Sequence, residues 1–194
     1  MLYTRKGDDG TTKTLHCDQR LSKSSSIAEA LGVVDELNSL LGYCRTQCQG
    51  EPLPRIKGEF LRKKGFILAF PNLFLAVQQN LFIIQAELAG APGKTIVVEK
   101  ITALEKIIDG IEKELPLIKS FFIPGITADG ALLDYARTVA RRAERRVVKA
   151  REENLVKLSD STLSYLNRLS SLLYALARLV NYQSGIKEQS PDYK

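Results

Sequence analysis

The segment "ARTVARRAERRVVKAR" (136–151) contains six arginines, one lysine and a single glutamate, Glu144. At about 100° per residue it divides into two faces of a helix. One face is small and apolar, which lets neighbouring helices approach closely: Ala136, Val139, Ala140, Ala143 and Val147. The other face is charged: Arg137, Arg141, Glu144 and Arg151. The segment therefore predicts a central bundle helix whose arginines need anionic partners.

Other parts of the chain have the same helical spacing of apolar residues. Ser26 and Glu29 are placed to form a capping box at the start of the first such segment. Gly65 and Pro71 are expected to break or kink the ambiguous apolar stretch before the second. The expected helices cover residues 26–50, 73–90, 97–115, 130–154 and 159–185. Because no strand alternation is found, the sequence predicts an all-α, up-and-down bundle of about five helices.

Length and composition are those of an ordinary globular chain. With 194 residues, 44% of them hydrophobic and 26% charged, a single domain over 1–194 is expected. The polar segment 1–26 is expected to form an extended N-terminal arm, and 187–194 a flexible tail. The N-terminus has no apolar signal region, and the apolar stretch 66–77 is too short to span a bilayer. We therefore expect a cytoplasmic protein without membrane contact.

Metal-binding residues are scarce. His16 is the only histidine, which excludes a di-iron bundle that needs Glu-x-x-His from each of two helices. The three cysteines, Cys17, Cys44 and Cys48, have no disulfide-framework spacing and are expected to be reduced. Cys44 and Cys48 lie one helical turn apart, but two thiols alone do not make a zinc site. No metal held by the protein alone is expected.

The N-terminal stretch "YTRKGDDGTTKT" (3–14) combines glycines, hydroxyl groups and basic residues. Gly7 and Gly10 permit positive φ, so successive backbone N–H groups can turn inward around an anion. The candidate phosphate ligands around them are Thr4, Arg5, Lys6, Thr11, Thr12 and Lys23. The order of residues is not that of a Walker A loop, and a lone GDDG is more often a simple turn. Together with the arginine helix and the net charge of +6, the arm favours a polyphosphate ligand.

Two further polar residues are placed where they need a partner. Asp35 lies among apolar residues of the first helix, so it requires a cation, for which an arginine of the 137–145 set is the natural candidate. That contact could cross a subunit boundary. Asn167, near the start of the last helix, is placed either to orient a ligand or to cap the helix. Glu144 lies where it can orient Arg141.

Several segments, taken together and in order, resemble the PduO-type ATP:cob(I)alamin adenosyltransferases. They are "YTRKGDDGTT" (3–12), "SK" (22–23), "GVVDELNS" (32–39), "NLFIIQAELA" (80–89), "FFIPG" (121–125), "ARTVARRAERR" (136–146) and "YLNRLSSLLYALAR" (165–178). The resemblance covers nearly the whole chain. It implies a homotrimer of five-helix bundles with active sites between subunits. The implied activity is transfer of the 5′-deoxyadenosyl group of ATP, bound with Mg²⁺, to cob(I)alamin, giving adenosylcobalamin and triphosphate.

The resemblance also implies roles for individual residues. The implied ATP-binding residues are Thr4, Arg5, Gly7, Asp8, Gly10, Thr11, Lys23, Arg141, Glu144 and Asn167, of which Lys23 and Arg141 act on the leaving triphosphate. Asp35 and Arg137 match an intersubunit salt bridge. Phe121 or Phe122 matches an aromatic residue that keeps the lower face of the corrin clear of water and of an axial ligand. A cobalamin reductase and an adenosylcobalamin-dependent enzyme are implied as partners.

The chain departs from the family pattern at three positions. Asp134 stands where the family usually has histidine, Ile126 where it has a second glycine after the proline, and Gln85 where it has glycine. The segment 50–75 is also unusually apolar. These differences concern the corrin side of the site more than the ATP side.

The alternative is a non-catalytic basic helical bundle that binds nucleotide, corrinoid or nucleic acid. Nucleic acid is disfavoured because Glu144 interrupts the basic face, and the aromatic content of 7% supplies no stacking platform on that helix. The sequence does not distinguish the enzyme from a bundle that only senses a nucleotide or corrinoid. The assay that separates it from the enzyme mixes reduced cobalamin and ATP with the protein.

Overall fold

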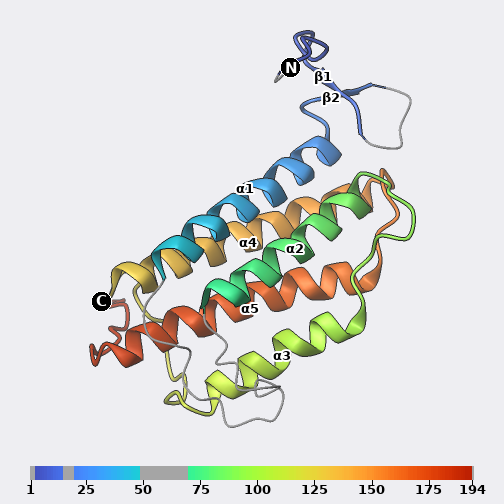
Figure 1. Ribbon diagram of the computed structural model, residues 1–194. Coiled ribbons are helices and arrows are strands. Elements are labelled where there is room, and N and C mark those ends of the chain that lie inside the picture. Colours follow the sequence, from blue (N-terminus) through green and yellow to red (C-terminus); the bar gives the residue numbers. More distant parts are fainter. Residues whose placement is uncertain (1–2, 15–19, 49–69, 194) are drawn as a thin grey trace.

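The computed structural model describes residues 3–14, 20–48 and 70–193. This part of the chain contains five helices (Figure 1): α1 (Ser26–Gln47), α2 (Phe70–Leu88), α3 (Val98–Glu112), α4 (Ala128–Glu152) and α5 (Asp160–Gln183). The prediction of an all-α five-helix fold is confirmed, and the helix ends lie within a few residues of the expected ones.

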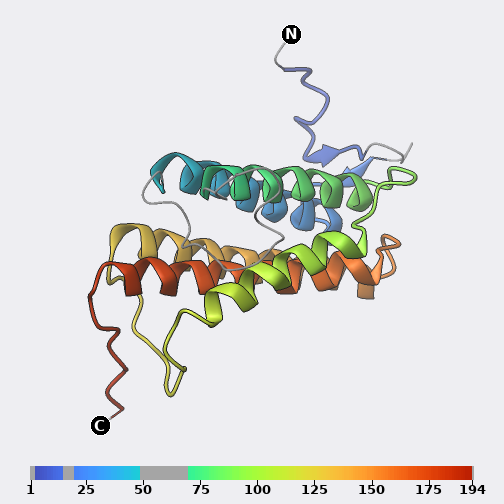
Figure 2. The same cartoon turned by 60° about the horizontal axis from the view of Figure 1, so that its bottom comes forward.

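Helix α4 lies in the middle of the bundle. It packs against α1 on one side and α5 on the other, while α2 packs on α1 and α3 packs on α5. Figure 2 shows α1 and α2 as one layer above the layer of α4 and α5. The small face of α4 explains its position, because Ala136, Ala140, Ala143 and Val147 are completely buried. The predicted central helix is therefore confirmed.

The starts of α1, α4 and α5 are fixed by hydroxyl side chains, whereas α3 begins after Val97 without a side-chain cap. Ser25 caps α1 by accepting from the Ala28 backbone N–H, so the cap is one residue before the Ser26 predicted from sequence. Thr127 caps α4 and Ser159 caps α5 in the same way.

Pro71 lies inside α2, because the helix begins at Phe70 and not at residue 73 as the sequence predicts. It occupies the first turn of α2, where its missing N–H removes no intrahelical hydrogen bond. Gly65 and the rest of the ambiguous stretch before Phe70 lie outside the described residues.

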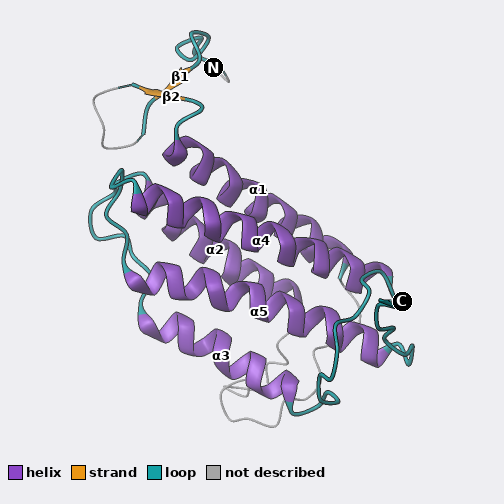
Figure 3. Cartoon of the chain, turned by 180° about the vertical axis from the view of Figure 1, so that it is seen from behind, coloured by secondary structure: helices purple, strands orange, loops and turns teal. Residues whose placement is uncertain are grey.

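A two-stranded antiparallel sheet, β1 (Thr11–Thr12) with β2 (Leu21–Ser22), was not predicted. Strands of two residues carry no alternation that a sequence pattern can reveal. The pair shapes the arm, which projects beyond the bundle at the N-terminal end of α1 (Figure 3).

The cysteines of α1 are consistent with a structural role. Cys44 and Cys48 are buried free thiols, and burial raises their pKa values to about 11 and about 12. Thiols of such high pKa are poor nucleophiles and poor metal ligands. In the part of the chain that the structure describes, no three His, Cys, Asp or Glu side chains gather into a metal site, and no helix is long and apolar enough to cross a membrane. His16 and Cys17 fall outside that part.

The C-terminal segment after α5 makes contacts that its polar composition did not suggest. Its residues Glu188, Gln189 and Ser190 bind to α5 and to the loop between α3 and α4. The expected flexibility of 187–194 stays a prediction.

Candidate active site

A cleft of about 520 Å³ lies where the loop before α4 meets α4 and α5. The loop contributes Ile118, Lys119, Ser120 and Phe121, α4 contributes Arg137 and Arg141, and α5 contributes Ser170, Ser171 and Tyr174. One wall is therefore cationic and another is apolar. Such a cleft suits a ligand that has both an anionic part and a large apolar part.

Arg141 is exposed in this cleft and has no hydrogen bond or ion pair to any other described residue. Most other arginines of α4 do pair with carboxylates of the same chain: Arg137 with Asp134, Arg142 with Glu36, Arg146 with Glu29 and Arg151 with Asp160. Arg145 is also exposed and without such a partner among the described residues, but it does not line the cleft. Arg141 is thus the arginine of α4 that is both in the cleft and available to an anionic ligand.

Ion pairs between α4 and α1 supply the anionic partners for two of the α4 arginines. Glu29 and Glu36 of α1 face Arg146 and Arg142 of α4, so the two helices run antiparallel with complementary charges. All four side chains are about half exposed, so each pair contributes little stability. These arginines neutralise a neighbouring helix and are not expected to bind the ligand.

Within this one chain Arg137 is held by Asp134. Its guanidinium donates to both carboxylate oxygens of Asp134, at 2.7 and 3.4 Å, and lies 5.9 Å from the ring centre of Tyr174. Asp35 accepts a hydrogen bond from the Gln85 side chain at 3.3 Å. Within this one chain Asp35 and Arg137 therefore have other partners, and these partners are two of the residues that depart from the family pattern.

Glu144 is oriented by Asn167, and among the described residues it forms no hydrogen bond or ion pair with Arg141. The Asn167 amide donates to the Glu144 carboxylate at 3.0 Å, and its oxygen accepts from Arg168 at 2.9 Å. Arg168 in turn forms an ion pair with Glu105 of α3 at 2.9 Å. This series of contacts fixes the direction of the Glu144 carboxylate. The hydrogen bond between Glu144 and Asn167 was not predicted from the sequence.

The two phenylalanines of the 121–122 doublet lie in different environments. Phe121 lines the cleft and is 79% exposed. Phe122 lies against Arg178, whose guanidinium carbon is 5.2 Å from the ring centre. Phe121 is therefore the member of the doublet that is available to an apolar ligand.

The arm brings its predicted residues together around two turns. Lys23 donates to the Gly7 carbonyl oxygen at 2.7 Å, and a side chain added at Gly7 would lie 3.1 Å from the lysine nitrogen. Gly10 and Arg5 have positive φ values of 77° and 58°. For arginine this conformation is strained, and such strain is typical of functional loops. Thr4 and Asp8 lie in the same exposed segment.

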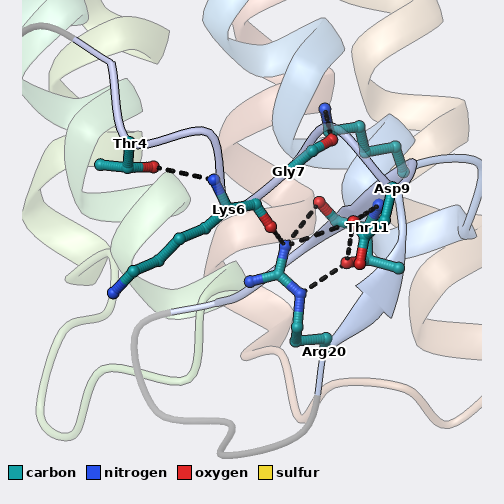
Figure 4. A network of polar contacts seen from close by, with 7 residues as sticks. Thr4, Lys6, Gly7, Asp9, Thr11 and Arg20 are labelled. Atoms are coloured by element: carbon teal, nitrogen blue, oxygen red, sulfur yellow. Dashed lines mark hydrogen bonds and ion pairs between the residues drawn. The ribbon is translucent and has the colours of Figure 1, made fainter.

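Arg20 organises this loop and was missed by the sequence analysis. It donates to the Thr11 hydroxyl at 2.5 Å, to the Thr11 carbonyl at 3.0 Å and to the carbonyl of Lys6 (Figure 4). Thr11 also donates to the Asp9 carboxylate at 2.7 Å, and this hydrogen bond lowers the pKa of Asp9. Because Arg20 acts across nine residues or more, no local spacing signals its role.

The other missed residue of note is Tyr174, in the cleft. Burial raises the pKa of its phenol, so it stays neutral and can donate a hydrogen bond over the whole physiological pH range. In the sequence Tyr174 shares a polar row of α5 with Asn167 and Arg178, but this spacing alone indicates no particular role.

The arm and the cleft lie apart in one chain. The arm precedes α1, and Glu29 in the first turn of α1 lies beside Arg146 in the C-terminal part of α4. The cleft is formed by the loop before α4 and by residues of α4 and α5, and no described residue of the arm lines it. Figure 1 shows the arm and the C-terminal segment at the two ends of the molecule. A single chain therefore does not bring its arm onto its own cleft.

The fold and site define a helical bundle with a basic, partly apolar cleft and a projecting arm that contains the Gly7–Gly10 turn. Residues 2–180 match the cobalamin adenosyltransferase family. The chain belongs to this family, and the resemblance to its PduO-type members is confirmed.

Individual relatives agree with this assignment. The chain is 36% identical over 188 residues to the corrinoid adenosyltransferase of Bacillus subtilis, covering 95% of this chain and 89% of that protein. It is 38% identical to the corrinoid adenosyltransferase PduO of Salmonella typhimurium, covering 91% of this chain but only 48% of that longer protein. A solved structure of a variant PduO-type ATP:corrinoid adenosyltransferase from Lactobacillus reuteri, complexed with cobalamin and ATP, has a TM-score of 0.81 and 29% identity, covering 100% of this chain and 97% of that one.

Proposed function

We propose that the protein transfers the 5′-deoxyadenosyl group of ATP to cob(I)alamin, giving adenosylcobalamin and triphosphate. Cobalt(I) supplies the electron pair for the new cobalt–carbon bond, and the bond between C5′ and the phosphate oxygen breaks with its electrons leaving on triphosphate. The observation that carries the proposal is Arg141, which has no ion-pair partner among the described residues and lies in a cleft that also contains Phe121. Family membership and the relatives named above support the same reaction.

The leaving group needs more help than the nucleophile, because cobalt(I) is already strongly nucleophilic. Triphosphate gains negative charge on its bridging oxygen as the bond breaks, and Arg141 and Lys23 are the cations we assign to that charge. Glu144 and Asn167, fixed against one another, orient the nucleoside. Magnesium enters as part of the Mg·ATP substrate, since triphosphate oxygens supply most of its ligands.

The arm residues form the remainder of the ATP site. Gly7 and Gly10 allow the backbone to approach the phosphates, and Arg20 keeps the turn in shape. The roles proposed for the arm side chains are phosphate and ribose contacts by Thr4, Arg5, Asp8, Thr11 and Lys23.

Phe121 is assigned to the corrin. An aromatic ring against the lower corrin face excludes water and the axial base, so that cobalt is four-coordinate and easier to reduce to cobalt(I). The proposed reaction therefore requires a cobalamin reductase upstream and an adenosylcobalamin-dependent enzyme downstream, and we place all three in the cytoplasm.

A homotrimer with active sites between subunits accounts for the separation of arm and cleft. In this arrangement the arm of one subunit closes over the cleft of its neighbour. The proposed intersubunit salt bridge between Asp35 and Arg137 then requires Gln85 and Asp134 to release or share their present partners. Exposed apolar residues on α1 and α2, such as Tyr43 and Phe82, are available for burial between subunits.

Replacement of Lys23 by alanine is expected to weaken ATP binding by about ten- to a hundredfold, because a charge-assisted phosphate contact is lost. The kcat at saturating ATP should fall less than the affinity. Isothermal titration with a non-hydrolysable ATP analogue measures the dissociation constant directly. Lys187→Ala, on the exposed C-terminal segment, is the matched control, and an unchanged dissociation constant in the Lys23 variant would refute its role.

The assay that tests the proposed function mixes chemically reduced cobalamin, Mg·ATP and the protein without oxygen. Appearance of the adenosylcobalamin absorption spectrum, with one triphosphate released per cobalamin, is expected. A bundle that only binds nucleotide or corrinoid would give neither product, and that result would contradict the proposal.

A further inference from the structure

Arg178 of α5 is an almost completely buried arginine, with 6% of its surface exposed. Its guanidinium forms an ion pair with Glu188 of the C-terminal segment at 3.1 Å, and that carboxylate is itself only 15% exposed. The same guanidinium donates to the Pro116 carbonyl at 3.2 Å and stacks on the ring of Phe122. One buried cation thus joins α5, the C-terminal segment and the loop before α4.

The C-terminal segment also touches that loop directly. The Ile123 backbone N–H donates to the Gln189 carbonyl at 2.8 Å, and the hydroxyl groups of Ser120 and Ser190 lie 2.6 Å apart. These two contacts lie on either side of the Phe121–Phe122 doublet. The residues that flank the doublet, Ser120 and Ile123, are therefore bound by residues 190 and 189. Phe122 itself packs against Arg178.

The loop has few other restraints. Residues 116–127 form no helix or strand, and Phe121, Leu117 and Ile118 are largely exposed. Segments with few buried contacts open easily. By contrast, a buried ion pair that loses one partner leaves an uncompensated charge, which is strongly unfavourable. The Arg178–Glu188 pair therefore couples the C-terminal segment to the loop more firmly than surface contacts would.

We propose that Arg178 and Glu188 are positioning residues that hold the 116–123 loop so that Phe121 stays in the cleft against the corrin. The proposal rests on the proposed adenosyltransferase function, and adds the C-terminal segment to the corrin side of the site. Neither residue touches the reacting atoms, since Arg178 faces Phe122 and Phe121 is the residue that lines the cleft.

The test compares Glu188→Gln with Glu188→Asp, which keeps the carboxylate, and with the control Glu153→Gln. Glu153 pairs with Lys149 at 3.6 Å on the exposed end of α4, so its loss removes a glutamate charge without affecting the loop. Hydrogen exchange of the Ile123 amide and the Michaelis constants for cob(I)alamin and ATP are measured for each protein. Circular dichroism checks that each variant is folded.

In Glu188→Gln, exchange at Ile123 is expected to be at least about tenfold faster, because the buried pair is broken. The KM for cob(I)alamin should rise about tenfold or more through misplacement of Phe121, while the KM for ATP stays the same. In Glu188→Asp the exchange rate at Ile123 and the KM for cob(I)alamin should both return much of the way to the wild-type values. In Glu153→Gln both should match the wild type.

Unchanged exchange at Ile123 would overturn the proposed restraint, and faster exchange with an unchanged KM for cob(I)alamin would overturn the positioning role. If the wild-type protein formed no adenosylcobalamin, the proposed function and with it the corrin role would fail. The exchange rates of the variants would then still show whether the Arg178–Glu188 pair restrains the loop.

Discussion

Replacement of Arg141 by alanine is expected to lower kcat for adenosylcobalamin formation by about a hundred- to a thousandfold, the usual effect of removing one group that stabilises developing negative charge. Arg141 lines the cleft and has no carboxylate partner among the described residues, so its charge is available to the leaving triphosphate. The fold should survive, because the side chain is exposed and buries no apolar surface. Single-turnover kinetics at saturating ATP measures the loss at the chemical step.

Arg146→Ala is the matched control for this variant. Arg146 is an exposed arginine of the same helix, but it lies outside the cleft and pairs with Glu29 at 3.5 Å. Its loss should leave turnover close to that of the wild type, because exposed ion pairs contribute little. Near wild-type adenosylation by the Arg141 variant would contradict the assignment of the cleft as the active site.

Replacement of Phe121 by alanine is expected to lower turnover by about one to two orders of magnitude, the range for loss of an apolar contact in a specific pocket. Without the ring, water or the axial base can reach cobalt from below, and reduction to cobalt(I) becomes harder. ATP binding should be unaffected, because the side chain is 79% exposed and lies in the apolar wall of the cleft.

The spectrum of bound cob(II)alamin provides the decisive readout for Phe121. The wild type with ATP should convert bound cob(II)alamin to the four-coordinate form. In Phe121→Ala the bound cob(II)alamin should stay five-coordinate. Leu117→Ala, in the same loop but outside the cleft, is the control and should behave as the wild type. Full conversion to the four-coordinate form by the Phe121 variant would exclude the proposed role.

The helices could be predicted from sequence because each one has an apolar face with a regular period. The face of α4 made of Ala136, Ala140 and Ala143 even predicted that this helix is central, since only small residues allow two neighbours to pack closely. Helix starts were less predictable. Ser25 and Ser26 are both good capping residues, and only the backbone conformation decides between them.

The charge pairs of α4 could not be predicted, because their partners lie far away in the sequence. Arg142 and Glu36 are 106 residues apart, and nothing in either segment indicates that the other faces it. The sequence did indicate that the basic helix needs carboxylates or phosphates. The structure shows that Arg142 and Arg146 pair with carboxylates of α1, whereas Arg141 lies in the cleft.

The loops limited the prediction of the site. The doublet Phe121–Phe122 has no periodicity, so the sequence left both residues open as the corrin contact. The structure separates them, because Phe121 lines the cleft and Phe122 stacks on Arg178. The organising role of Arg20 in the arm depends on hydrogen bonds to backbone carbonyls, which any residue type supplies. Local sequence carries little information about such contacts.

The central claim is that the arm of one subunit and the cleft of another form one active site for adenosyl transfer. Mixing Lys23→Ala subunits, which have a defective arm, with Arg141→Ala subunits, which have a defective cleft, tests it at limiting ATP. After subunit exchange, the account predicts recovery to about a quarter of wild-type activity, the statistical share of sites with an intact arm and cleft in a random 1:1 oligomer. Activity of the mixture no higher than the average of the two parent variants would contradict the account.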